Sequence, residues 1–141
     1  QAVLVASTGV IGMQLPMDRL RAGIGAMVPK LEDTRQAAAA AAQAIMTTDT
    51  HKKEATVTFT VDGKTVTVGG MSKGSGMIHP NMCTMLGFLT TDVAISKELL
   101  QKALSTVVKD TYNMVSVDGD TSTNDTVLLL ANGAAGNDEL T

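Results

Sequence analysis

The sequence is poor in aromatic residues and cysteine, and it has no long apolar run. Its aromatic residues are Phe59, Phe88 and Tyr112, too few for a surface on which nucleic-acid bases stack. The single Cys83 excludes an internal disulfide and fits a reducing compartment, so we expect a cytoplasmic protein. No apolar stretch approaches the ~20 residues that span a bilayer, and we therefore expect no membrane partner.

Net charge and chain length further limit the possible class of protein. The formal net charge is −3 and the basic residues are scattered, which leaves no basic footprint for nucleic acid or an anionic membrane. With 141 residues, 44% of them hydrophobic, the chain is long enough for one domain with its own core. It starts at Gln1, without an initiator methionine, and we expect it to be a fragment of a longer protein.

Helix signals recur along the chain. Three helices are predicted, over residues 16–27, 33–46 and 96–107. Pro16 suits the first turn of the first helix, Asp33 or Thr34 can cap the second, and Ser96 can cap the third. The second helix carries six consecutive alanines, which allow close packing against a sheet or another helix. A fourth helix is predicted from Ser122 or Thr123 through residue 131, because small polar residues precede an apolar run.

Strand signals alternate irregularly with these helices. Strands are predicted over residues 3–6, 55–61, 64–68, 84–89 and 114–117. Asp62-Gly63 between the second and third of them is the signature of a two-residue hairpin turn. The mixture predicts an α/β (α+β) layered sandwich with a mixed sheet, in a single domain over residues 1–141.

Thr84 is the most informative residue. It follows a glycine-rich, proline-containing segment and precedes an apolar run, within residues 73–87 (KGSGMIHPNMCTMLG). A threonine hydroxyl is a weak nucleophile unless a base activates it, and the threonine's own α-amine can do so when cleavage makes the residue N-terminal. That amine titrates near ~7.7–8, so a neutral fraction exists at physiological pH. Taken alone, the residue can equally be a structural threonine that opens a strand.

Four segments give the chain a family resemblance. They are residues 5–12 with 15–18 (VASTGVIG and LPMD), 44–50 (AIMTTDT), 73–87, and 117–125 (VDGDTSTND). In this order they resemble the ornithine acetyltransferase (glutamate N-acetyltransferase) family, whose nucleophile motif reads KGxGMIxPNMATML. The resemblance covers nearly the whole chain. It implies the self-cleaving fold of that family, shared with related aminopeptidases.

The resemblance implies an activity and the residues that perform it. The family moves acetyl from N-acetylornithine to glutamate in arginine biosynthesis, by a ping-pong route through an acetyl-threonine. Thr84 would be the nucleophile, and the Cys83–Thr84 bond the site of autoproteolysis. Thr8 and Gly9 would form the oxyanion hole.

Substrate contacts and partners follow from the same resemblance. Thr47 and Lys73, together with Thr84, would bind substrate, and a lysine suits the α-carboxylate that glutamate and N-acetylornithine share. Residues 1–83 would end an α chain and residues 84–141 begin a β chain, which pair as a heterotetramer of two α and two β chains. No cofactor is implied, although some members accept acetyl-CoA as donor.

The chain departs from the family pattern at two positions, where Cys83 and His79 replace alanine. Further substrate-binding residues of the family lie beyond Thr141. Two other functions therefore stay open. One is a related amidase or aminopeptidase, in which water replaces glutamate as acceptor. The other is a non-catalytic, uncleaved fragment.

Two sets of residues in the sequence have side chains of the kind that bind cations. His51, His79 and Cys83 lack the paired spacing of a zinc site, so no metal is expected. The acidic residues at 118, 120 and 125 lack the spacing of a calcium loop. They are better explained by a turn whose side chains accept hydrogen bonds from nearby backbone amides.

Overall fold

The computed structural model describes residues 3–76, 85–120, 122 and 124–141. Its helices and strands are α1 (Met17–Met27), α2 (Arg35–Ala44), β1 (Lys53–Val61), β2 (Lys64–Lys73), β3 (Leu86–Thr91), α3 (Lys97–Val107) and β4 (Thr126–Ala131). Short 3-10 turns occupy Val28–Lys30, Val108–Asp110 and Tyr112–Met114.

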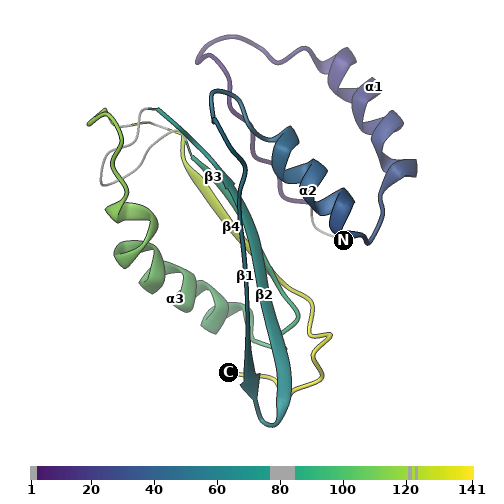
Figure 1. Cartoon of the computed structure of the whole chain (residues 1–141), viewed down its shortest axis with the longest axis vertical. Coiled ribbons are helices and arrows are strands. Elements are labelled where there is room, and N and C mark those ends of the chain that lie inside the picture. Colours follow the sequence, from purple (N-terminus) through teal and green to yellow (C-terminus); the bar gives the residue numbers. More distant parts are fainter. Residues whose placement is uncertain (1–2, 77–84, 121, 123) are drawn as a thin grey trace.

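The four strands form one mixed sheet in the order β1-β2-β3-β4. β2 is antiparallel to β1 and to β3, whereas β3 and β4 are parallel. A parallel pair needs a long crossover, and α3 lies within the one that joins β3 to β4. α3 covers one side of the sheet, α2 lies on the other, and α1 lies farther out on the side of α2 (Figure 1). The α+β class and the mixed sheet that the sequence predicts are confirmed.

The hairpin between β1 and β2 has the predicted turn. Asp62 and Gly63 both have positive φ angles, 49° and 75°, and the flanking pair in the ladder is Val61 with Lys64. Positive φ at both central residues is the requirement of the two-residue turn that matches the strand twist. The strands are longer than predicted, since the ladder extends to Lys53 paired with Ser72.

The predicted starts of the first three helices are also confirmed. Thr34 Oγ1 accepts a hydrogen bond of 3.1 Å from the amide of Ala37, and Ser96 Oγ accepts one of 3.4 Å from the amide of Leu99. Each bond satisfies an amide that the first turn of a helix leaves free. α1 starts directly after Pro16 and ends where predicted.

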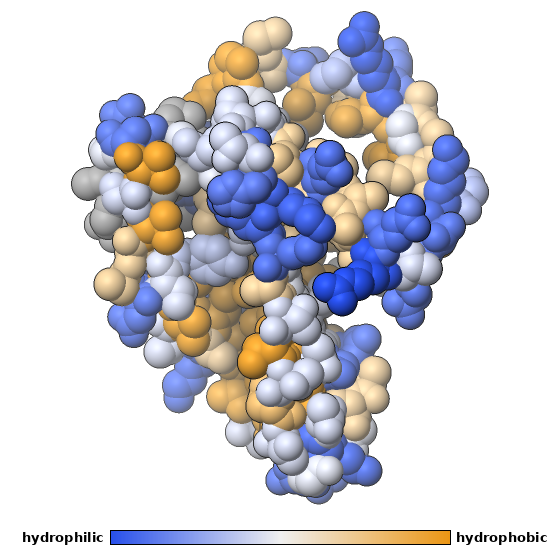
Figure 2. Space-filling model, viewed as in Figure 1, coloured by the Kyte–Doolittle hydropathy of each residue, from blue (hydrophilic) through white to orange (hydrophobic). Residues whose placement is uncertain are grey.

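The core is small. Val66, Ala42, Leu86 and Val93 are the buried apolar residues of the described part. Ala42 lies on α2, so the alanine run does pack closely at one point. Many large apolar side chains are exposed, and Figure 2 shows apolar surface on the face in view. None of the described helices combines the length and the apolar character needed to cross a membrane.

Three predicted elements are wrong. Residues 3–6 form no strand, since no strand of the described part of the chain pairs with them and Val3 and Val5 are 83% and 85% exposed. Residues 114–117 form no strand either, because Met114 closes a short 3-10 turn and the three residues after it belong to no strand. The helix predicted up to residue 131 is instead β4. Its apolar run hydrogen-bonds along β3 in parallel, which outweighs the helix-like start signal.

The strand predicted over residues 84–89 is displaced toward the C-terminus, as β3. Residue 84 lies outside the described residues.

Candidate functional site

Lys73 is the last residue of β2, and its side chain contacts Thr47. Both residues are predicted from the sequence to bind substrate. Its side chain is buried, with 4% of the residue exposed, and Nζ donates a hydrogen bond of 2.8 Å to Thr47 Oγ1. Thr47 belongs to the loop between α2 and β1, 26 residues earlier. Among the described residues, no carboxylate lies within ion-pair distance of this ammonium. Lys73 is thus a buried cation with a neutral partner.

Asp49 holds that loop against the end of β2. Its Oδ1 accepts hydrogen bonds from the amide of Gly74 at 2.9 Å and from Lys53 Nζ at 2.5 Å, and its Oδ2 accepts one from the amide of Thr47 at 3.4 Å. Gly74 has φ +146°, a conformation that favours glycine. Asp49 therefore connects the residue next to Lys73 with the residue that Lys73 binds.

The pKa of Asp49 reflects these contacts. Burial would raise it, but the hydrogen bonds from Lys53, Gly74 and Thr47 outweigh burial and lower the pKa from 3.8 to about 2. The carboxylate is therefore ionised throughout the physiological range.

A further bond of 2.5 Å joins Thr48 Oγ1 to Ser75 Oγ and fastens the same loop to the segment after β2.

The start of β3 lies beside the end of β2. Lys73 pairs with Leu86, and Leu86 pairs in parallel with Thr126 of β4, so three strand ends meet at one edge of the sheet. A cavity of about 370 Å³ lies between this edge and the segment from α3 to Val115. Lys73, Lys53 and Asp125 are its charged lining residues. The lining of the cavity thus includes two lysines and one aspartate beside a mostly apolar wall.

Asp125 is the residue before β4. Its Oδ1 accepts a hydrogen bond of 2.7 Å from the amide of Met85, whereas Oδ2 is buried and finds no hydrogen-bond donor among the described residues. Burial raises the pKa of Asp125, and the bond from Met85 offsets part of that rise.

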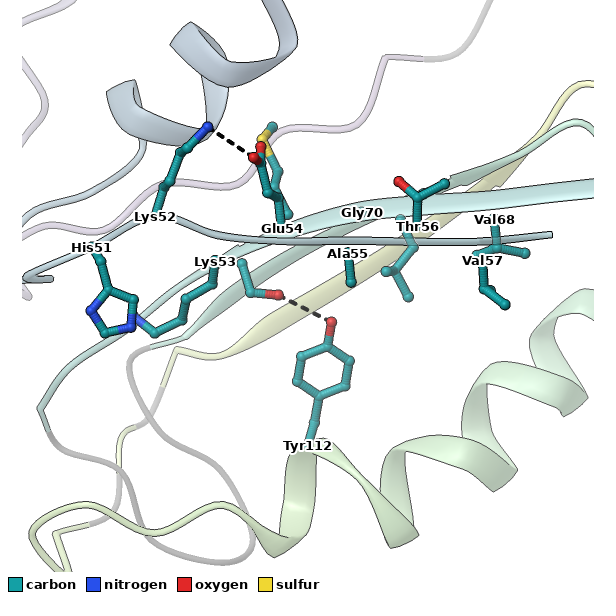
Figure 3. A pocket seen from close by; sticks show the side chains of 14 residues that line it. His51, Lys52, Lys53, Glu54, Ala55, Thr56, Val57, Val68, Gly70 and Tyr112 are labelled. Atoms are coloured by element: carbon teal, nitrogen blue, oxygen red, sulfur yellow. Dashed lines mark hydrogen bonds and ion pairs between the residues drawn. The ribbon is translucent and has the colours of Figure 1, made fainter. Parts of the chain in front are cut away.

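A second cavity, of about 510 Å³, lies along β1 and β2 on the side of Tyr112 (Figure 3). Tyr112 points from its 3-10 turn toward β2, where its hydroxyl lies 3.1 Å from Ser72 Oγ. The ring also packs on β3, since a Cβ at Gly87 would lie 3.2 Å from the Tyr112 hydroxyl oxygen. Tyr112 thus links α3 to the two central strands near Lys73.

The predicted oxyanion residues lie in the segment that precedes α1, which contains no helix or strand. Thr8 is half-buried and Gly9 is exposed. The Thr8 carbonyl accepts a hydrogen bond of 2.9 Å from Ser7 Oγ. Within the described part of the chain, no hydrogen bond joins either residue to Thr47 or Lys73, so their role stays a prediction.

The predicted nucleophile and cleavage site, Thr84 and Cys83, lie outside the described residues, and so does His79. Their neighbour Met85 is described, and it is held at the edge of the sheet where Lys73 ends. The structure therefore brings Thr47 and Lys73 together, and Met85, which follows Thr84 in the chain, lines the same cavity as Lys73.

Of the three zinc candidates, His51 alone lies within the described residues. His51 Nδ1 lies 3.0 Å from Thr50 Oγ1, and no three His, Cys, Asp or Glu side chains of the described residues cluster as metal ligands would. In the acidic loop, Asp118 Oδ1 accepts a bond of 3.2 Å from the amide of Asp120, as expected for a turn.

Two residues of the site were missed as site residues by the sequence analysis. Asp49 lies inside the segment 44–50, and Asp125 ends the segment 117–125. Both segments are part of the family resemblance, but their sequences do not show that Asp49 accepts a hydrogen bond from Gly74 or that Asp125 accepts one from Met85. Only the folded chain shows those partners, because 25 and 40 residues separate them.

Comparison with known proteins identifies the family. Residues 1–141 match the ArgJ family. The chain is 59% identical over 139 residues to the "Arginine biosynthesis bifunctional protein ArgJ" of Geobacillus kaustophilus, covering 99% of this chain and 33% of that protein. It is 55% identical over 137 residues to the protein of the same name in Thermotoga neapolitana, covering 97% of this chain and 34% of that protein. The chain thus spans about a third of the length of these relatives. The resemblance drawn from the four motifs is confirmed, and the chain belongs to the ArgJ family.

Proposed function

We propose that this chain is the central part of an acetyltransferase of arginine biosynthesis, the pathway that its relatives' names state. The enzyme moves acetyl from N-acetylornithine to glutamate, works in the cytoplasm and needs no cofactor, with acetyl-CoA as an alternative donor. The observation that carries the proposal is the buried Lys73, which has only a neutral hydroxyl partner among the described residues. A buried cation is costly unless it is paired, and a substrate carboxylate would supply the missing charge.

The proposed chemistry begins with cleavage. The Thr84 hydroxyl attacks the carbonyl carbon of Cys83, the Cys83–Thr84 peptide bond breaks, and the acyl group shifts from nitrogen to oxygen. Water then hydrolyses the ester. The Cys83 carboxylate and the free α-amine of Thr84 result, and they divide the protein into chains that end at residue 83 and begin at residue 84.

Two transfers make up the proposed turnover. The α-amine of Thr84 takes the proton of its own hydroxyl as the oxygen attacks the acetyl carbonyl of N-acetylornithine. The amine of ornithine takes that proton as its C–N bond to the acetyl group breaks, and ornithine leaves. The amino group of glutamate then attacks the acetyl-threonine, and its proton passes through the α-amine to the Thr84 oxygen, which restores the hydroxyl and gives N-acetylglutamate. Thr8 and Gly9 are proposed to stabilise the oxyanion in both steps, for which one donor is worth roughly 2.7–4 kcal/mol. This route belongs to the self-cleaving fold and to the heterotetramer that the resemblance implies.

The test uses the full-length protein with and without Thr84→Ala. Intact masses under denaturing conditions should reveal two chains, divided between Cys83 and Thr84, in the unsubstituted protein alone. Acetylglutamate formed from N-acetylornithine and glutamate should likewise require Thr84. Release of free acetate without acetylglutamate would indicate an amidase instead. An uncut, inactive protein would refute the proposal. The isolated 141-residue chain is expected to be inactive, because further substrate-binding residues of the family lie outside it.

A further inference from the structure

The amide and the carbonyl of Met85 are both hydrogen-bonded, to the consecutive residues Asp125 and Thr126, which lie far along the chain. Its amide donates to Asp125 Oδ1 at 2.7 Å, and its carbonyl accepts a bond of 3.1 Å from the amide of Thr126. The second bond belongs to the parallel pairing of β3 and β4. The first does not, because a side chain supplies the acceptor in place of a backbone carbonyl. The sequence has thus placed a carboxyl group where strand pairing itself offers no partner.

A carboxyl group at this position has a cost. Oδ2 is buried without a donor among the described residues, and burial raises the pKa of the group. An amide side chain would accept the same bond without a buried charge. Asp125 and Lys73 both line the same cavity, so the carboxyl group lies at the candidate site and not in a remote turn.

The hydrogen bond between the Met85 amide and Asp125 also bears on residue 84, because a peptide bond joins residues 84 and 85. The peptide unit that joins residues 84 and 85 is planar and rigid, so an acceptor fixed to its N–H restrains the whole unit. Catalytic groups must be held within narrow limits, and a misplacement of about 1 Å can cost about 10²-fold in rate.

We infer that Asp125 is a positioning residue for the nucleophile, since it binds the amide of Met85, the residue that follows Thr84 in the chain. The inference rests on the proposed function, because it takes Thr84 as the nucleophile. Asp125 itself need not touch substrate.

The test compares Asp125→Ala and Asp125→Asn in the full-length protein, with Asp120→Ala as a matched control from the exposed part of the same loop. Asp125→Ala should lower both kcat and kcat/KM of acetyl transfer by about 10- to 100-fold, with KM within about twofold, because positioning acts on the reacting state. Asp125→Asn keeps an oxygen acceptor and should retain most of the activity. Asp120→Ala should behave as the unsubstituted protein.

A second measurement covers the case in which Asp125→Ala does not fold. With 15N-methionine labelling, the Met85 amide resonance should shift in Asp125→Asn and stay unchanged in Asp120→Ala. An unchanged Met85 resonance in Asp125→Asn would mean that the contact is absent, and the inference would fail.

The outcomes separate this inference from the proposed function. An unsubstituted protein that neither cleaves nor transfers acetyl would refute the proposed function, and the inference with it. An active protein whose Asp125→Ala variant keeps its kcat would refute the inference alone. Equal losses in Asp125→Ala and Asp125→Asn would show that the negative charge matters, and would also overturn positioning by an acceptor.

Discussion

Lys73 and Thr47, 26 residues apart, share a hydrogen bond of 2.8 Å at the end of β2. The lysine is buried and its partner carries no charge. Among the described residues this hydroxyl is the one hydrogen-bond partner of the ammonium, and since it accepts only one of the three ammonium protons, donors remain for an anion.

Replacement of Lys73 by methionine should therefore weaken substrate binding. The change keeps the apolar stem and removes the charge. A hydrogen bond to a charged group is worth about 1.5–3 kcal/mol, so KM for glutamate or N-acetylornithine should rise by about 10- to 150-fold in the full-length enzyme. Steady-state kinetics measure this. Thr47→Val, which removes only the neutral partner, should have the smaller effect, and the reverse order would contradict this role of the ammonium.

Asp49 should make stability depend on pH in acid. Its pKa falls from 3.8 to about 2 on folding, so the folded state holds its proton less tightly than the unfolded state. The stabilisation is complete above pH 3.8 and disappears as the pH falls through about 2.

The corresponding free energy is about 2 kcal/mol. Urea unfolding should therefore show Asp49→Asn to be less stable than the unsubstituted protein at pH 7, with the gap narrowing towards pH 2. Glu139→Gln, at an exposed position, is the control and should change little. A gap that stayed constant with pH would exclude the ionised form of Asp49 as the source.

Gly70 should not tolerate alanine. An added Cβ would meet the Leu89 side chain and lie 3.0 Å from the Phe88 carbonyl oxygen, which belongs to the backbone of β3 and cannot easily move. A loss of about 1–3 kcal/mol in the free energy of unfolding is expected. Gly23→Ala is the matched control, because nothing lies within 4 Å of its added Cβ. Gly23 lies within α1, where alanine is the better helix former by about 0.5–1 kcal/mol. Thermal unfolding of the two variants should shift in opposite directions.

The Tyr112–Ser72 bond should contribute about 0.5–1.5 kcal/mol. Tyr112→Phe and Ser72→Ala, alone and combined, form a double-mutant cycle that isolates it. The two single losses should add to more than the loss of the double variant. Strict additivity would mean that the two hydroxyls do not interact.

Local chemistry accounts for the elements that the sequence predicted correctly. Thr34 and Ser96 each satisfy an amide within three residues, and Asp62-Gly63 supplies both positive φ angles of its turn. Such signals do not depend on the rest of the fold.

The errors arise where partners far along the chain decide. The apolar run of β4 suits a helix or a strand equally, and only its pairing with β3 selects the strand. Residues 3–6 have a strand-like composition, but in the described structure no strand pairs with them. Dependence on partners far along the chain also explains why only part of the candidate site could be predicted from the sequence. The motifs predict Thr47 and Lys73 as site residues, whereas the contacts of Asp49 and Asp125 are visible only in the folded chain.

The order of strands has a consequence for the cleaved protein. A break between residues 83 and 84 would leave β1 and β2 on one polypeptide and β3 and β4 on the other. The six residue pairs from Val68 with Thr91 to Lys73 with Leu86 would then join two molecules. Unfolding of the cleaved form would separate these molecules, so its midpoint should rise with protein concentration. After self-cleavage, the stability of a protein with this topology would be that of a complex of two chains and not that of a single folded chain.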